Sequence, residues 1–182
     1  MAIGMSSGFI EPLEASALVM VELAAAMIAD QLPPTRDVMD IVAERYNRKF
    51  LRHWQQIIEF LKLHYVLSAR DDSAYWQDNR AASSIPEKLS EQLSLWRYRS
   101  PWHQDAEAVD DLFPVPSYQY ILYGMGFRTV PRHTGSHRHD QHQQHAAELF
   151  RKNAARAAQL QQALPGNREL LNKVREFGFQ KL

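Results

Sequence analysis

The feature that most constrains the fold is a run of apolar residues that recur every three or four positions between residues 38 and 65. This spacing places their side chains on one face of an α-helix. Thr35 precedes the run as a suitable N-cap, and Asp37 would lie in the first turn, where a carboxylate is favourable. The pattern therefore predicts one long amphipathic helix. Its apolar residues are Val38, Ile41, Val42, Tyr46, Phe50, Trp54, Ile57, Ile58, Leu61 and Tyr65.

A second helix is predicted before the long one, over residues 15–29. It is rich in alanine and apolar on nearly all sides, which is typical of a helix that packs on most of its surface. Pro33 and Pro34 cannot continue it. Residues 13–32 have roughly the length of a membrane span, but Glu22 would lie near the middle, which favours a buried helix.

Shorter helices are predicted further along the chain, and an irregular acidic segment at residues 100–116 is interpreted as a loop. Ser84 before Pro86 is typical of a capped helix start, and that helix would reach about Arg97. Tyr75 and Trp76 start a short aromatic turn or helix. The remaining predicted helices are one capped by Ser117 that ends before Gly124, a polar one over residues 140–163 and a last one from Asn167 to about Phe177.

Only one strand is predicted, at Met1–Met5, followed by a tight turn at Ser6-Ser7-Gly8. The predicted fold class is therefore mainly α with one residual N-terminal strand, for which no partner strand is visible. We divide the chain into residues 1–12 (strand and turn), 13–127 (helical region) and 128–182 (polar, His-rich helical tail).

Charge and composition exclude several classes of function. The 21 Lys and Arg residues balance 21 Asp and Glu residues, so no electrostatic argument supports nucleic acid or an anionic membrane as a partner. The chain has no cysteine, which excludes disulfides, thiolate zinc sites and a cysteine nucleophile. Because no export signal is recognisable, we expect a cytoplasmic protein.

Five histidines lie close together between residues 133 and 145. Histidines spaced by three could share a helix face and bind a transition metal weakly. No carboxylate or thiolate set completes a clear site, so we favour a solvated polar segment and predict no metal site. The five are His133, His137, His139, His142 and His145.

Three segments resemble the flavin-dependent tryptophan halogenase family, in that family's order and spacing. They are AIGMSSGFIEPLEASAL at residues 2–18, HYVLSARDDSAYW at residues 64–76 and LFPVPSYQYILYGMGF at residues 112–127. The Glu-Pro-Leu-Glu box in the first segment is the most specific part. No clear likeness is recognised from Arg128 onward.

The resemblance implies an enzyme that halogenates an electron-rich aromatic, such as an indole or a phenol. The family uses reduced FAD, O2 and halide, with a flavin reductase as partner. In the family, the segment before the box is the last strand of the FAD-binding domain. The resemblance therefore implies that this chain corresponds to the C-terminal, substrate-side third of a family member.

Several parts of the family's flavin site are missing from these 182 residues. The sequence has no G-x-G-x-x-G motif after a strand, no Trp-x-Trp-x-Ile-Pro motif and no lysine in a segment like that of the family's catalytic lysine. We therefore expect the chain alone neither to retain FAD nor to turn over.

Glu14 matches the family's catalytic glutamate. The resemblance implies that Glu14 positions hypohalous acid or takes the proton from the arenium intermediate, and a carboxylate at a helix start suits either role. The alternative is that Glu14 only caps its helix. Glu11, in the same box, is interpreted as structural.

Other residues of the first segment match the family's halide and flavin contacts. The backbone amides of Ser16 and Ala17 would bind the halide, although the family often has Thr and Gly there. The residues expected along the flavin edge could alternatively serve only a tight turn. They are Gly4, Ser6, Gly8 and Phe9.

The third segment matches the family's substrate pocket. Phe113 and Tyr118 stand where the family has aromatic residues that enclose an indole, and Leu112 replaces what is often an aromatic residue. That departure puts free tryptophan in doubt as the substrate. The alternative is that these side chains are ordinary core residues.

Two further interpretations of the whole chain remain open. It could be a helical module that binds a small aromatic ligand or acts with a separate flavin-binding domain in trans. It could also be a truncated, non-functional gene product.

Overall fold

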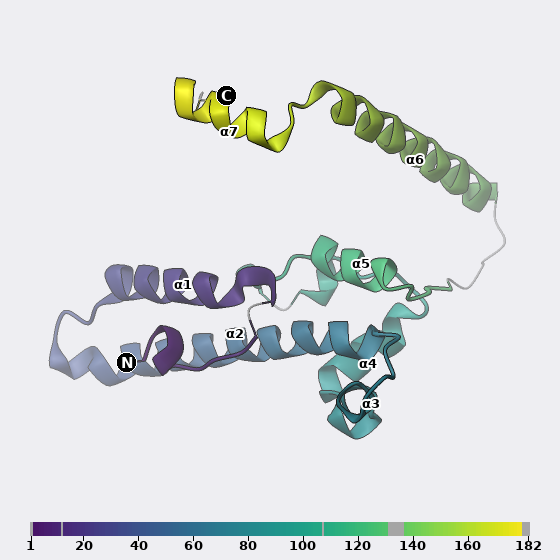
Figure 1. Cartoon of the computed structure of the whole chain (residues 1–182). Coiled ribbons are helices and arrows are strands. Elements are labelled where there is room, and N and C mark those ends of the chain that lie inside the picture. Colours follow the sequence, from purple (N-terminus) through teal and green to yellow (C-terminus); the bar gives the residue numbers. More distant parts are fainter. Residues whose placement is uncertain (1, 12, 107, 131–136, 180–182) are drawn as a thin grey trace. The chain divides into compact units, whose positions relative to one another are not determined.

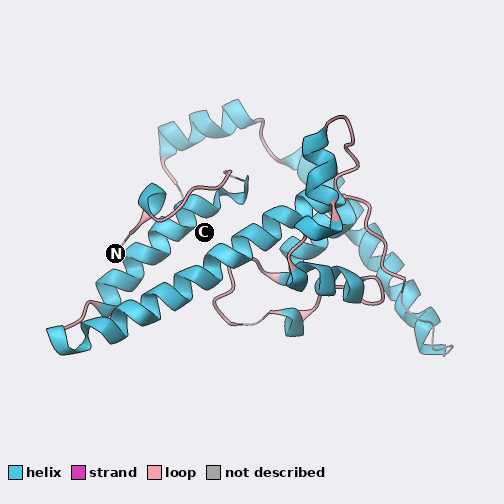
Figure 2. Cartoon of the chain, turned by 90° about the horizontal axis from the view of Figure 1, so that it is seen from below, coloured by secondary structure: helices cyan, strands magenta, loops and turns pink. Residues whose placement is uncertain are grey.

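The computed structural model describes residues 2–11, 13–106, 108–130 and 137–179, and the side chains of residues 137–140 are not among those described. Helices and loops make up this part of the chain, so the predicted mainly α class is confirmed (Figure 2). The helices are α1 (Ser16–Gln31), α2 (Met39–Leu67), α3 (Ala74–Arg80), α4 (Glu87–Trp96), α5 (Val115–Gly124), α6 (His137–Ala163) and α7 (Asn167–Phe177).

The predicted strand at Met1–Met5 is wrong for the described residues 2–5. Gly4–Ser6 form a single 3-10 turn, and Gly4 has a φ of 64°, which favours glycine. The Ser6 hydroxyl donates to the Ile3 carbonyl at 2.8 Å and accepts the Ile3 N–H at 3.2 Å. A strand needs a neighbour to pair its backbone groups, whereas this turn pairs them locally.

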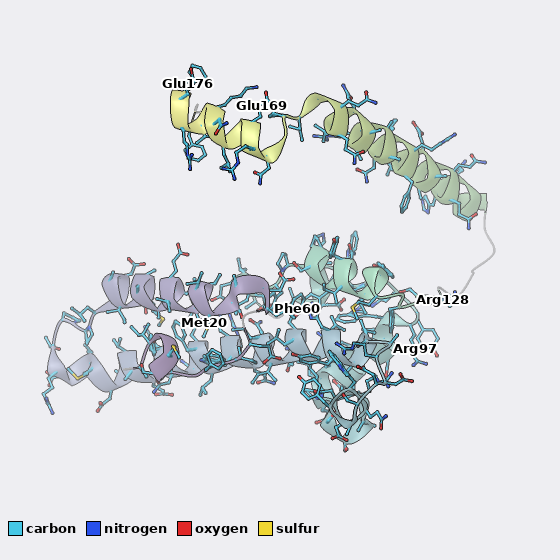
Figure 3. The ribbon with its side chains drawn as sticks, in the orientation of Figure 1. Met20, Phe60, Arg97, Arg128, Glu169 and Glu176 are labelled. Carbon is cyan, nitrogen blue, oxygen red and sulfur yellow. The ribbon has the colours of Figure 1, made fainter. Side chains whose placement is uncertain are left out.

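The long amphipathic helix predicted from the sequence is α2, which has 29 residues and contacts α1, α3 and α5. Helix α1 runs back along it in the opposite direction (Figure 1). Met20, on the side of α1 that meets α2, belongs to a buried cluster between the two helices (Figure 3). The other buried members are Ala24 from α1 and Tyr46, Phe50, Ile57 and Leu61 from α2.

The C-terminal end of α2 takes part in a second buried cluster. Leu63 packs there with Leu89 and Trp96 of α4 and with Leu122 of α5. The Trp96 indole N–H donates to the Asp105 carboxylate at 3.1 Å. Because α2 contributes to both clusters, it fixes the position of the loop between α4 and α5 as well as that of α1.

The chain forms two compact units, Met1–Arg132 and His133–Leu182. The second unit contains α6 and α7, whose surfaces carry ion pairs four residues apart, Glu148–Lys152 and Glu169–Lys173, each at 2.7 Å. In the described ranges, no helix combines the length and the apolar character that a membrane crossing requires.

Candidate active site

The turn that leads into α1 has an unusual backbone. Glu14 and Ala15 both adopt positive φ angles, 61° and 51°, which cost a non-glycine residue about 1–2 kcal/mol each. Ser16 then begins the helix and is buried, with its hydroxyl donating to the Leu13 carbonyl at 3.4 Å. Such strained positions persist only where the surroundings hold them, and they occur preferentially at functional sites.

Glu11 anchors the segment before this turn. The Tyr65 hydroxyl of α2 donates a hydrogen bond to the Glu11 carboxylate. Burial raises the pKa of Tyr65, and the hydrogen bond to Glu11 raises it further. Tyr65 therefore remains a neutral donor, and Glu11 has the structural contact expected of it.

A cavity of about 140 Å³ lies between the start of α1 and the start of α5. Glu14 and Ser16 line one side of it, and Leu112 and Phe113 line the other. An apolar cavity of roughly 150 Å³ can hold a benzene ring, so this one has the size for a single aromatic ring. The remaining lining residues are Val19, Pro114 and Ser117.

Phe113 is held by an aromatic contact with α2. Its ring stacks on Phe60, with the centroids 4.0 Å apart and the planes 10° from parallel. Phe60 is fully buried beside α5 (Figure 3). The buried ring of Phe60 thus packs against Phe113, which lines the cavity.

Tyr118, the other residue expected in the substrate pocket, does not line the Glu14 cavity. It makes edge-to-face contact with Phe60 at 5.1 Å and packs on Trp96 at 5.5 Å. It lines a second, narrow space together with Phe113, away from Glu14. The structure therefore brings Leu112 and Phe113 to the Glu14 cavity, whereas Tyr118 lies outside its lining, packed on Phe60 and Trp96.

The residues that match the family's flavin contacts line a third cavity, of about 270 Å³. Gly4, Gly8 and Phe9 line it together with Ala17 of α1 and the Trp54 ring of α2. Ser6 is not among the lining residues, and its hydroxyl bonds the Ile3 backbone within its own turn.

This third cavity suits part of a flavin. Its other walls are mainly Met, Leu and Val side chains, which fit the apolar face of a planar ring. Phe9 is 75 % exposed and Leu18 is 74 % exposed, so the apolar surface continues beyond the cavity. No charged side chain lines the cavity in the described part of the chain, so nothing there matches a pyrophosphate.

The first two residues of α1 lie between these two cavities. Ser16 lines the cavity beside Glu14, and Ala17 lines the one beside Gly4 and Gly8. The first N–H groups of a helix have no partner within the helix, and the helix dipole favours a negative charge there. The geometry is therefore compatible with a halide held between a flavin ring and an aromatic substrate.

Sequence reasoning misses the residues that support this site from α2. The sequence predicts Trp54 only as one of the apolar residues of the long helix, yet its ring lies 2.9 Å from where a Cβ on Gly8 would stand. No sequence signal singles out Gln56, although its side chain bonds the loop that carries Leu112. The periodic pattern places Trp54 on the apolar face, does not include Gln56, and cannot identify the partners of either residue, which are distant in sequence.

The His-rich segment gives little structural information. His133 and the side chains of His137 and His139 lie outside the described residues, as does Pro12 of the Glu-Pro-Leu-Glu box. His142 and His145 are exposed on α6. Within the described ranges, no group of three or more His, Asp or Glu side chains could hold a metal ion.

Comparison with known proteins identifies consistent relatives. A family profile described as tryptophan halogenase matches residues 1–142. The chain is 33 % identical to a 7-chloro-L-tryptophan 6-halogenase from Kutzneria sp., over 96 % of this chain and 33 % of that protein. It is 32 % identical to a tryptophan 6-halogenase from Streptomyces toxytricini, over 69 % of this chain and 24 % of that protein.

Solved structures give the same result. The crystal structure of a tryptophan halogenase from Shewanella frigidimarina superposes with a TM-score of 0.87 at 50 % identity, covering 100 % of this chain and 34 % of that one. A flavin-dependent halogenase from Brevundimonas sp. superposes with a TM-score of 0.80 at 26 % identity, over 96 % and 34 %. The likeness continues past Arg128, where the sequence alone shows no clear match, and the chain spans about a third of the length of these relatives.

Proposed function

Because the chain belongs to the tryptophan halogenase family, we propose that it forms the substrate side of a flavin-dependent halogenase active site. The observation that carries this proposal is the cavity in which Glu14 and Ser16 face Leu112 and Phe113. The three segments that resemble the family are far apart in sequence, and two of them meet at this cavity.

Each side of the cavity has its own role in the proposed reaction. The apolar side chains of Leu112 and Phe113 hold the ring of an electron-rich aromatic, such as an indole or a phenol. The Glu14 carboxylate accepts the proton that the ring carbon loses after it has taken the halogen. The amides of Ser16 and Ala17 hold the halide.

The flavin would lie along Gly4, Ser6, Gly8 and Phe9, with the apolar cavity beside Trp54 against its ring. When bound, reduced FAD together with O2 supplies the oxidising power that makes a halide electrophilic. A flavin reductase is the partner that regenerates the reduced cofactor. Because the 182 residues lack a dinucleotide-binding motif, we infer that they retain no FAD without a flavin-binding domain.

A second candidate is a complementation module that acts with a flavin-binding domain in trans. The exposed apolar side chains of Phe9 and Leu18 favour it, because both border the proposed flavin surface. The two candidates share the same substrate cavity. Specific binding of an aromatic ligand at that cavity would argue against a non-functional gene product.

Indole binding tests the proposed cavity directly. We expect the chain to bind indole, as measured by ligand-observed NMR, and Phe113→Ala to weaken binding by about five- to tenfold because the stacked ring wall is lost. Phe150→Ala is the matched control, since Phe150 is exposed on α6. Equal affinity of wild type and Phe113→Ala would show that the cavity does not bind the ring.

A further inference from the structure

The loop that carries Leu112 and Phe113 lies along one face of α2. Asp110 pairs with Lys49 at 2.9 Å and with Arg52. Three residues later, the Phe113 ring stacks on Phe60. The loop and the helix are therefore in contact at both ends of this short segment.

Gln56 makes the contact between those two ends. Its side-chain amide N–H donates to the Asp111 carboxylate, and its carbonyl oxygen accepts the Leu112 backbone N–H at 3.4 Å. The residue is only 5 % exposed. One side chain thus holds two successive residues of the loop, directly before the cavity wall.

We propose that Gln56 is a positioning residue for the aromatic-ring cavity, fixing the backbone at Asp111 and Leu112 so that Leu112 and Phe113 face Glu14. The assignment of a substrate to this cavity rests on the proposed function. Gln56 itself does not line the Glu14 cavity and acts through the loop.

The other two contacts between the loop and α2 hold the backbone at Asp111 and Leu112 less precisely than Gln56 does. The Asp110 ion pairs are partly exposed, and exposed pairs contribute little and are screened by salt. The stack of Phe60 and Phe113 holds the Phe113 ring and makes no hydrogen bond to the loop backbone. Gln56, by contrast, uses an amide N–H as donor and its carbonyl oxygen as acceptor at the same time, so this buried side chain must present both groups in one geometry.

Hydrogen exchange of the Leu112 amide measures the positioning. We expect Gln56→Met, which keeps the side-chain length and removes both bonds, to speed this exchange by about tenfold. Gln55→Met is the matched control on the neighbouring position, because Gln55 bonds only Glu59 within the same helix in the described chain. Equal exchange in the two variants would overturn the proposal.

A double variant that swaps the hydrogen-bonding groups of residues 56 and 111 separates the positioning role from an effect on general stability. Gln56→Glu keeps the acceptor for the Leu112 N–H and places a carboxylate against Asp111, so exchange at Leu112 should rise. Adding Asp111→Asn restores a donor and an acceptor in reversed order. We expect the double variant to recover slow exchange and the melting temperature, whereas failure to recover either would contradict a specific role for Gln56.

Indole affinity links the positioning to the cavity. We expect it to weaken in Gln56→Glu and to recover in the double variant, in parallel with Leu112 exchange. If Leu112 exchange responds but indole binds none of the three proteins, the positioning role of Gln56 is supported and the proposed function fails. If indole binds wild type, Gln56→Glu and the double variant equally, the positioning role fails and the proposed cavity stands.

Discussion

Glu14 and Ala15 are the two non-glycine residues with positive φ among those described. A glutamate that only capped a helix would not require this backbone, since an N-cap residue normally lies in the extended region. The left-handed pair turns the chain just before α1, so that Glu14 and Ser16 line the same cavity. The strain is therefore a reason to favour a functional role for Glu14 over capping alone.

Replacing Ala15 with glycine tests this strain. We expect Ala15→Gly to raise the free energy of unfolding by about 1 kcal/mol, because glycine adopts a positive φ without steric cost. Ala25→Gly, at an exposed position inside α1, should lower it by about 1 kcal/mol. Chemical denaturation measures both, and destabilisation by Ala15→Gly would show that the turn is not strained.

Gly8 is required by its packing against α2. A Cβ at Gly8 would stand 2.9 Å from the Trp54 ring, so we expect Gly8→Ala to lower the free energy of unfolding by about 1–3 kcal/mol. Gly124→Ala is the control, because a Cβ added to Gly124 would have nothing within 4 Å of it among the described residues. A neutral Gly8→Ala in the same denaturation experiment would mean that Trp54 moves freely.

At the scale of elements, the length and face of α2 are predictable from periodicity because its apolar residues repeat over many turns. Helix α7 is predicted as Asn167–Phe177, which is what the structure shows. Helix α5 begins at Val115, before the predicted cap at Ser117, since Pro116 is tolerated in a first turn. The predicted strand is wrong because a short apolar run does not show whether a partner strand exists.

The candidate site is predictable only where the family resemblance supplies it. Glu14, Ser16, Leu112 and Phe113 are named from motifs, and the structure brings them to one cavity. Gln56 cannot be named in this way, because its partners Asp111 and Leu112 lie more than fifty residues away and leave no local pattern. Their pairing depends on how the loop folds back on α2.

The ion pairs between α2 and the loop predict a pH dependence. Hydrogen bonds from Lys49 and Arg52 lower the pKa of Asp110 to about 2, against about 3.9 in the unfolded chain. A carboxyl whose pKa is lowered by folding stabilises the fold at pH values above its pKa in the unfolded chain. This stabilisation is lost as the pH falls through the pKa of the folded state. The contribution stays below about 1 kcal/mol because the pair is partly exposed.

We therefore expect the free energy of unfolding to fall between about pH 4 and about pH 2, and to fall less in Asp110→Asn. His53, whose pKa is lowered by burial and raised in part by the nearby Asp110, adds its own destabilisation on acidification, so the slopes of the two curves between about pH 4 and about pH 2 are the quantity to compare. Asp40→Asn, at a carboxylate without an ion pair among the described residues, controls for loss of charge. Parallel curves for wild type and Asp110→Asn would contradict the assignment.

At the scale of the whole molecule, the chain covers about a third of the length of its relatives, and its cavities are compatible with the substrate side that we propose. One cavity suits an aromatic ring, one suits the apolar face of a flavin, and the start of α1 lies between them. We therefore expect catalysis to need the remaining two thirds of a family member.

The most direct measurement is bromination by a chimera. Residues 1–182 replace the aligned third of the Shewanella frigidimarina tryptophan halogenase, and indole is supplied with FAD, a flavin reductase and bromide. We expect brominated indole by mass spectrometry, a loss of about 10²- to 10⁴-fold in Glu14→Gln with FAD binding retained, and no product from the isolated chain. Bromination by the isolated chain, or an undiminished rate in Glu14→Gln, would contradict the proposed division of the active site.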